Sequence, residues 1–151
     1  MLFRSLVLGE ATVFEGSKAI WKLRANGDSE FFDDKGNAWR AAETFGVDGS
    51  VTFLSKVLLR ITDTAITGPD GITPQLMTIN GNTLTVAIRE EPDGEPAQVP
   101  VVLGADGNVT VQRQSAGQPV VRWRIEAKQA DVMRTAFFAF GTTITPRIRG
   151  Q

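Results

Sequence analysis

The chain has 151 residues, a formal net charge of −1, 42% hydrophobic residues and 22% charged residues. This length and mixture are typical of one globular domain, which can bury enough surface to fold without a metal or a disulfide. Cysteine and histidine are both absent, which excludes thiolate nucleophiles, Cys-based zinc sites and every catalytic arrangement that needs an imidazole. Catalysis would have to rely on carboxylates, lysine or hydroxyl groups.

The first fifty residues predict short strands and one helix. Segment 1–9 is not typical of a signal peptide, because Arg4 interrupts its short apolar run and a small-residue cleavage pattern is missing. A helix is expected from Asn37 to Phe45, capped by Asn37 and ended by Gly46. Strands are expected at Leu2–Leu8, Ala11–Glu15, Ala19–Arg24 and Glu30–Phe32.

The middle of the chain alternates apolar and polar residues, which predicts half-buried antiparallel strands. The clearest run is Val51 to Ile66, in which Val51, Phe53, Val57, Leu59 and Ile61 share one face. The same pattern recurs at Leu84, Val86 and Ile88, and at Val121, Trp123 and Ile125. Turn sequences such as Asn80-Gly81-Asn82 and Ala105-Asp106-Gly107 separate these runs. We expect a meander of four or five strands from Gly71 to Glu126.

The C-terminal region is expected to begin with a second short helix from Ala127 to Thr135. A strand through residues 136–145 should follow and bend at Gly141. The basic tail Pro146–Gln151 would be either disordered or docked on a neighbour. The sequence therefore predicts a mainly β fold over residues 1–151, an antiparallel β-sandwich or open β-barrel with two short helices.

One short motif has a catalytic counterpart. Asp63-Thr64-Ala65 follows an apolar strand and resembles the Asp-Thr-Gly signature of retroviral-type aspartic proteases. That resemblance implies a carboxylate dyad that shares a proton across a dimer axis. Ala65 replaces the glycine at which the backbone must turn tightly. The departure favours a structural interpretation, in which Asp63 ends a strand before a turn.

Two acidic clusters could offer oxygen ligands to a hard cation. One is residues 90–95, and the other comprises Asp28, Glu30, Asp33 and Asp34. Neither has the twelve-residue spacing of an EF-hand. A carboxylate pair for hydrolysis is chemically conceivable, but with 17 acidic residues in the chain some pair always is. We interpret the clusters as solvated turns and expect no metal and no cofactor.

Charge is unevenly distributed along the chain. Residues 63–106 hold seven acids and one base, a net charge of −6, whereas residues from Arg113 onward hold seven bases and two acids, a net charge of +5. Either these segments neutralise each other within one molecule, or separate copies meet through opposite charges. The overall balance argues against a nucleic-acid partner.

Adjacent aromatic residues suggest a protein interface. In a strand, one ring of each pair would face away from the core. Either both faces of the sheet are covered and core packing explains both rings, or the outward ring is an apolar anchor for a partner. Residues of the basic tail could contribute to the same contacts. The candidate interface residues are Phe31, Phe32, Phe137, Phe138, Arg147 and Arg149. Trp21, Trp39 and Trp123 are expected in the core or at its edge.

As a whole, the chain resembles the small β-rich virion proteins of tailed bacteriophages, such as capsid decoration, neck, tail or baseplate components. The resemblance lies in the absence of cysteine and of a signal segment, in the Thr- and Val-rich strands, and in the Asp-Gly turns. It implies a non-enzymatic, multi-copy subunit, made in the cytoplasm and carried in the virion, that binds itself and other particle proteins and has no membrane partner. A small-ligand-binding β-barrel and a carboxylate-dependent hydrolase are the alternatives.

Overall fold

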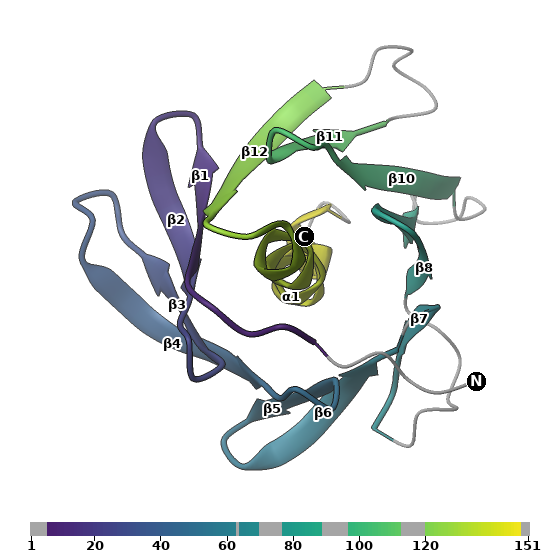
Figure 1. Cartoon of the computed structure of the whole chain (residues 1–151), viewed down its shortest axis with the longest axis horizontal. Helices are drawn as coiled ribbons and strands as arrows, with labels where there is room; N and C mark the ends of the chain where they lie inside the picture. The colour runs from purple at the N-terminus through teal and green to yellow at the C-terminus, as the bar shows by residue number, and fades with distance from the viewer. Residues whose placement is uncertain (1–5, 63, 70–76, 89–96, 113–119, 149–151) are drawn as a thin grey trace.

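The fold is a closed antiparallel β-barrel, seen in a computed structural model that describes residues 6–62, 64–69, 77–88, 97–112 and 120–148. Each strand pairs with its neighbours in sequence, and β1 pairs with β12 to close the ring (Figure 1). The strands of this part of the chain are β1 Ala11–Glu15, β2 Lys18–Leu23, β3 Asp28–Phe32, β4 Ala38–Phe45, β5 Ser50–Phe53, β6 Lys56–Ile61, β7 Ala65–Thr67, β8 Met77–Asn80, β9 Thr83–Ile88, β10 Ala97–Leu103, β11 Asn108–Val111 and β12 Val120–Ala127. Helix α1, Ala130–Ile148, follows β12.

The mainly β prediction is confirmed, and so is the expected meander, which corresponds to β8–β12. The β-sandwich and the open barrel are wrong, because the β1–β12 pairing joins the two ends of the sheet. Closure pairs the first and last strands, which would otherwise expose an edge. Among the described residues, no helix combines the length and the apolar character that a membrane span requires.

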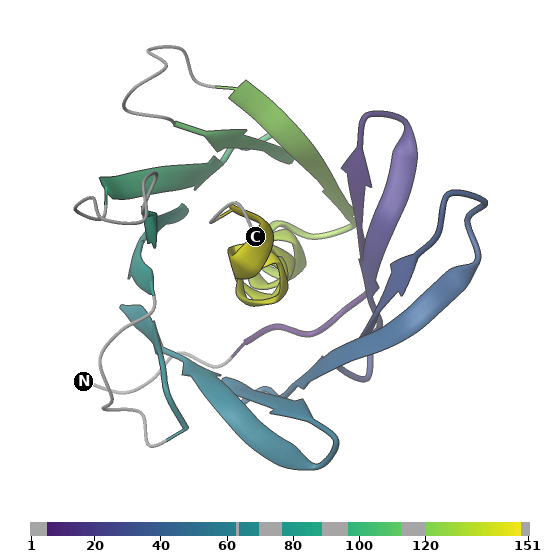
Figure 2. The same cartoon turned by 180° about the vertical axis from the view of Figure 1, so that it is seen from behind.

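Helix α1 lies inside the barrel, where the strands surround it (Figures 1 and 2). Phe140 packs between two tryptophans of the barrel wall, with ring centroids 5.5 Å from Trp21 and 5.3 Å from Trp123. Phe137 is also buried, and small residues such as Ala136 let the helix approach the strands closely. Between the helix and the β8–β12 side of the wall, Leu84, Trp123, Phe137 and Phe140 help to line an apolar cavity of only about 10 Å³.

The predicted strand over residues 136–145 is wrong, since this segment is part of α1. Its aromatic and β-branched residues favour a strand locally, but the strands of the closed wall already pair with one another. A helix satisfies its own backbone groups and therefore suits this interior. Thr142 and Thr143 donate their hydroxyls to the carbonyls of Ala139 and Phe140 at 2.8 and 2.9 Å. The expected short helix 127–135 corresponds to the beginning of α1, which is longer and starts at Ala130, because Ala127 is still part of β12.

The predicted helix from Asn37 to Phe45 is also wrong, because this segment is strand β4. Asp33 Oδ1 accepts hydrogen bonds from the backbone N–H groups of Lys35 and Asn37, both at 2.9 Å. These bonds hold a tight hairpin turn instead of a helix cap. Pairing with β3 then overrides the helix propensity of the alanine-rich sequence.

β-Bulges explain why some side chains lie on the other face of the sheet from the one predicted. Val51 and Ile61 are buried as expected, but Phe53 is partly exposed after a register shift between Val51 and Thr52. Val121 is exposed rather than buried, and a register shift also interrupts the pairing of β11 with β12. An extra residue in one strand reverses the alternation beyond it. Leu84, Val86, Trp123 and Ile125 are buried as predicted, whereas Ile88 is not described at side-chain level.

The two ends of the barrel differ. Residues 6–10, the strap, run past the first turns of α1 rather than forming the expected strand (Figure 1). Leu6 N–H donates to the carbonyl of Val47 at 3.0 Å, and Val7 N–H donates to Thr135 Oγ1 at 3.0 Å. We call the end of the barrel where these contacts lie the strap end. The opposite, tip end carries the turns β1–β2, β3–β4 and β5–β6, and α1 ends on that side (Figure 2).

Candidate interaction surface

The turn of the β5–β6 hairpin exposes an apolar residue in a strained conformation. Leu54 and Ser55 have φ values of 52° and 65°, in the left-handed region. Such two-residue turns ordinarily use Asn or Gly, because a side chain with a Cβ costs roughly 1–2 kcal/mol there. Leu54 is nevertheless 84% exposed. The turn thus carries a conformational cost, and the Leu54 side chain gains little burial in return.

Two further apolar side chains flank this turn. Phe53 is 36% and Leu58 is 38% exposed. Phe53, Leu54 and Leu58 together form what we call the tip surface. Aliphatic and aromatic groups gathered at a protruding hairpin are typical of a protein-binding site.

Trp39 was expected near the core but is 61% exposed on β4. The β3–β4 pairing shifts between Phe31↔Arg40 and Phe32↔Ala38, so Trp39 is the extra residue of a bulge. Bulges re-aim side chains at the edges of regular pairing. Trp39 therefore lies outside the core, on the strand next to β5 in the barrel order.

The candidate interface residues occupy different environments. Phe31 is buried and Phe32 is half-buried in β3. Phe137 and Phe138 are both buried, because the helix places both rings within the barrel, so core packing accounts for this pair and neither ring is an exposed anchor. Arg147 lies in the last turn of α1 without a described side chain, and Arg149 lies outside the described residues.

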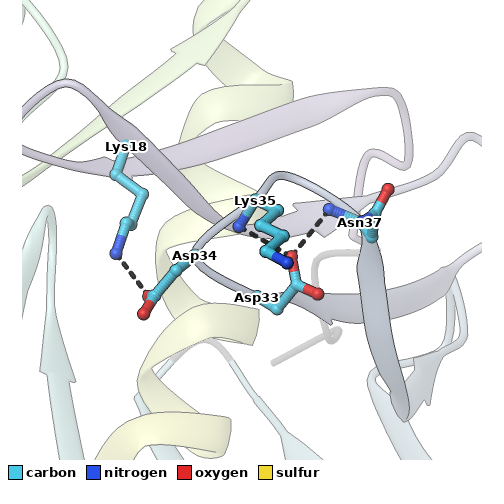
Figure 3. Close-up of polar contacts among 5 residues, drawn as sticks. All are labelled: Lys18, Asp33, Asp34, Lys35 and Asn37. Atoms are coloured by element: carbon cyan, nitrogen blue, oxygen red, sulfur yellow. Dashed lines mark hydrogen bonds and ion pairs between the residues drawn. The ribbon is translucent and has the colours of Figure 1, made fainter.

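The N-terminal acidic cluster is distributed among local contacts. Asp34 forms an ion pair with Lys18 of the neighbouring hairpin, while Asp33 holds its own turn (Figure 3). The Lys18 ammonium lowers the pKa of Asp34, first through its hydrogen bond and then through its charge. Asp28 accepts a hydrogen bond from Thr44 Oγ1 at 3.0 Å, and Glu30 pairs with Arg24. Each carboxylate therefore has a structural partner.

The other predicted sites are largely outside the described residues. Asp63 and the acidic run 90–95 are not described. Of the seven acids between residues 63 and 106, only Asp106 is described, and its carboxylate accepts hydrogen bonds from Asn108. Among the residues that the structure does describe, no group of three acids could hold a metal ion.

No protein-family model, curated protein or solved structure matches the chain. The sequence pattern does not reveal the tip surface, because the alternation predicts that Phe53 faces inward and that Leu54 lies in a continuous strand. The Phe53-Leu54-Ser55-Lys56 sequence, which interrupts the alternation with a leucine and a serine, was the available signal.

Proposed function

We propose that this chain is a non-enzymatic structural subunit that binds protein neighbours in a multi-copy particle. The observation that carries this proposal is Leu54, an apolar side chain that is 84% exposed in a turn whose φ of 52° disfavours it. The overall resemblance to tailed-phage virion proteins makes a virion the particle we propose, with the protein acting as a decoration, neck, tail or baseplate component.

The cost of the turn supports a binding role. A strained residue persists where the surrounding structure imposes it, and such residues gather at binding sites and active sites. Burying a leucine side chain contributes about 1.5–3 kcal/mol, which matches the cost of holding it in the left-handed region. The strain would then be offset on association, when Leu54 and its neighbours Phe53 and Leu58 leave water.

The filled interior supports a role at the outer surface. Helix α1 occupies the space where a ligand-binding barrel holds its ligand, and the described cavity beside it is about 10 Å³, far below the 300 Å³ or more of ordinary ligand pockets. A larger groove of about 870 Å³ lies at the strap end, where the strap and the first turns of α1 form its walls, and not in the interior that a ligand-binding barrel uses. The hydrolase alternative has no described feature in its favour.

The decisive variant improves the turn and removes its apolar group. Leu54→Asn with Ser55→Gly installs the residues that the turn geometry prefers, so the free energy of unfolding should rise by roughly 1–2 kcal/mol. Self-association, followed by sedimentation velocity over a range of concentrations, should fall markedly at the same time. A loss of association in a more stable protein cannot be ascribed to misfolding.

Val47→Asn is the matched control, since Val47 is another exposed apolar residue (56%) but lies at the strap end. This variant should associate like the unmodified protein. The proposal would be wrong if the stabilised double variant associated as strongly as the original chain. It would also be wrong if the original chain stayed monomeric throughout.

A further inference from the structure

Asparagine followed by glycine occurs twice in the chain, as Asn26-Gly27 in the β2–β3 turn and as Asn80-Gly81 in the β8–β9 turn. Glycine has no Cβ, so its backbone nitrogen is poorly shielded from the side-chain amide of the residue before it. That nitrogen can attack Cγ of the asparagine, a reaction that ends in loss of the amide group (deamidation). In a folded protein, the contacts that hold the two groups decide whether the attack takes place.

The Asn26-Gly27 dipeptide is held at both reacting groups. The Asn26 side chain accepts a hydrogen bond from Asp28 N–H at 3.0 Å, and its Nδ2 donates to Asp28 Oδ2 at 3.2 Å. Gly27 N–H donates to the carbonyl of Arg24 at 2.9 Å, and the Gly27 carbonyl accepts from Phe45 N–H at 2.8 Å. The side-chain amide and the glycine nitrogen therefore cannot meet unless each gives up a partner.

The Asn80-Gly81 dipeptide lacks these contacts. Both residues are exposed, and Gly81 is the first of two loop residues, with a φ of 61°. In the part of the chain that the structure describes, no hydrogen bond involves the Asn80 side chain or Gly81 N–H. A Cβ at Gly81 would meet nothing within 4 Å, so the space around this residue is open. The two reacting groups are therefore both unpaired and in contact with water.

A contact from helix α1 holds the β8–β9 turn closed. The Arg134 guanidinium donates to the carbonyl of Gly81, from Nε at 3.2 Å and from Nη2 at 2.9 Å, and Nε also donates to Asn82 Oδ1 at 3.1 Å. Asn80 pairs with Thr83 in the extended conformation of a strand. Bond formation between Asn80 Cγ and the Gly81 nitrogen requires the Asn80 backbone to rotate out of that conformation, so the turn has to open locally. Arg134 therefore opposes the motion that the reaction needs.

We propose that Asn80 is a site of spontaneous deamidation and that Arg134 controls its rate. The Gly81 nitrogen gives its proton to hydroxide and forms a bond to Asn80 Cγ. The bond between Cγ and Nδ2 then breaks, and ammonia leaves with a proton taken from water, which produces a cyclic succinimide. Water opens this ring at one of its two carbonyls and yields aspartate or isoaspartate at position 80. The chain gains one water and loses one ammonia without any oxidation or reduction.

Either product alters the β8–β9 hairpin. Both add a carboxylate to the residue before the carbonyl that Arg134 binds. Isoaspartate also inserts one carbon into the main chain, which displaces Asn80 from its register with Thr83. The hairpin packs against α1, since a Cβ at Gly141 would lie only 2.5 Å from Leu84 Cδ1. Modification should therefore loosen this packing, and because it needs no partner it is independent of the proposed function.

Peptide mapping by mass spectrometry, after incubation of the folded protein in mildly alkaline buffer, tests this inference. The peptide that contains Asn80 should gain the mass difference between an amide and a carboxyl group, and chromatography should resolve its aspartate and isoaspartate forms. The peptide that contains Asn26 should keep its mass over the same period. Protein unfolded in guanidinium chloride is the reference, in which both dipeptides should react at similar rates because no turn holds them.

Arg134→Gln tests the control of the rate. Without the guanidinium the turn should open more often, so deamidation of Asn80 in the folded protein should become roughly three- to tenfold faster. The Asn26 peptide should remain unmodified, which shows that the effect is local. Arg122→Gln is the matched control, because Arg122 lies on β12, whose neighbours are β11 and β1, and this variant should leave both rates unchanged.

Three results would overturn the inference. If Asn80 stays intact in the folded protein while the unfolded reference reacts, the turn protects this residue and no modification site exists there. If Asn26 reacts as fast as Asn80 in the folded protein, the difference in hydrogen bonding does not select the site. If Arg134→Gln leaves the rate at Asn80 unchanged, or accelerates both dipeptides equally, Arg134 does not control the β8–β9 turn.

Discussion

Two turns on successive hairpins have the same local structure but lie at opposite ends of the barrel. In the β2–β3 turn, Arg24 N–H donates to Asp28 O at 2.8 Å, and Gly27 N–H donates to Arg24 O at 2.9 Å. In the β3–β4 turn, Asp33 donates to Asn37 at 2.9 Å and Gly36 to Asp33 at 3.1 Å. Gly27 and Gly36 have φ values of 97° and 84°. Local chemistry alone does not distinguish them.

Their surroundings differ. The carbonyl of Gly27 accepts a hydrogen bond from Phe45 N–H at 2.8 Å, so this turn extends the pairing between β3 and β4. Gly49 and Gly107, in the β4–β5 and β10–β11 turns, accept comparable bonds from Ile61 at 2.7 Å and Ile125 at 2.8 Å. Around Gly36, by contrast, a Cβ would meet nothing within 4 Å. The strap end holds the barrel together, whereas turns at the tip end are free to present side chains.

Alanine substitutions at the two glycines should show the largest difference. A Cβ at Gly27 would lie 2.2 Å from the carbonyl oxygen of Phe45, which is backbone and cannot rotate away. Gly27→Ala should therefore lower the free energy of unfolding by at least about 3 kcal/mol. Gly36→Ala should lower the free energy of unfolding by only roughly 1–2 kcal/mol, the cost of a residue with a Cβ at a positive φ. Urea denaturation measures both, and equal losses would refute the distinction between the two ends.

The sequence could predict the parts of the fold that have a local pattern, and it could not predict those that depend on long-range pairing. Alternation correctly located most strands, because residues such as Leu84 and Val86 face a core on one side and water on the other. Turn chemistry correctly located the β8–β9 and β10–β11 hairpins. Barrel closure could not be predicted, since the pairing of β1 with β12 joins residues more than a hundred positions apart and has no local pattern.

The interior helix and the tip surface were missed for related reasons. Residues 136–145 have strand-like composition, and only their enclosure by a completed wall makes a helix favourable. Leu54 lies within the run that predicts a continuous strand, although as an apolar residue on the polar face it interrupts the alternation, and the turn at positive φ places it in solvent. In both cases tertiary structure overrides the local preference. Residues whose observed structure contradicts their local sequence preference, such as Leu54, are therefore the ones that point to a function.

Removing the charge of Asp48, in the β4–β5 turn at the strap end, should lower the free energy of unfolding by less than the glycine substitutions do. Hydrogen bonds from the backbone N–H and the hydroxyl of Ser50 lower the pKa of Asp48. A lowered pKa in the folded state stabilises the protein above the ordinary carboxyl pKa, and this contribution is lost as the pH falls through the folded value. Asp48→Asn should thus cost about 0.5 kcal/mol at neutral pH, a value reduced by exposure to solvent.

That difference should shrink below about pH 4, where the carboxyl of the original chain becomes protonated. Urea titrations at neutral and acidic pH would measure it. A constant gap between the two proteins would mean that the amide disturbs the turn by some means other than charge. Replacing Ser50 by alanine is the reciprocal control, because it removes the hydroxyl donor while leaving the backbone N–H in place.

We expect the smallest change in stability for a substitution of Asp34 at the tip end. Its pKa is lowered, like that of Asp48, in this case by the hydrogen bond and the charge of Lys18. The linkage has the same sign as for Asp48, so any stabilisation would be present at neutral pH and lost in acid. The pair is exposed, however, with 47% of the Lys18 side chain and 91% of the Asp34 side chain accessible to solvent. Solvent and salt screen such pairs, and ordering two long side chains offsets the remaining attraction.

Asp34→Asn should therefore leave the unfolding midpoint unchanged at neutral and at acidic pH, and Lys18→Met should do the same. The pair joins the turns of two hairpins, β1–β2 and β3–β4, which makes it a direct probe of whether the tip end contributes to global stability. A measurable loss in both variants would mean that these hairpins are held together by their tips. The tip end would then contribute to the stability of the fold, and the exposure of Leu54 there could no longer be taken as a sign of binding alone.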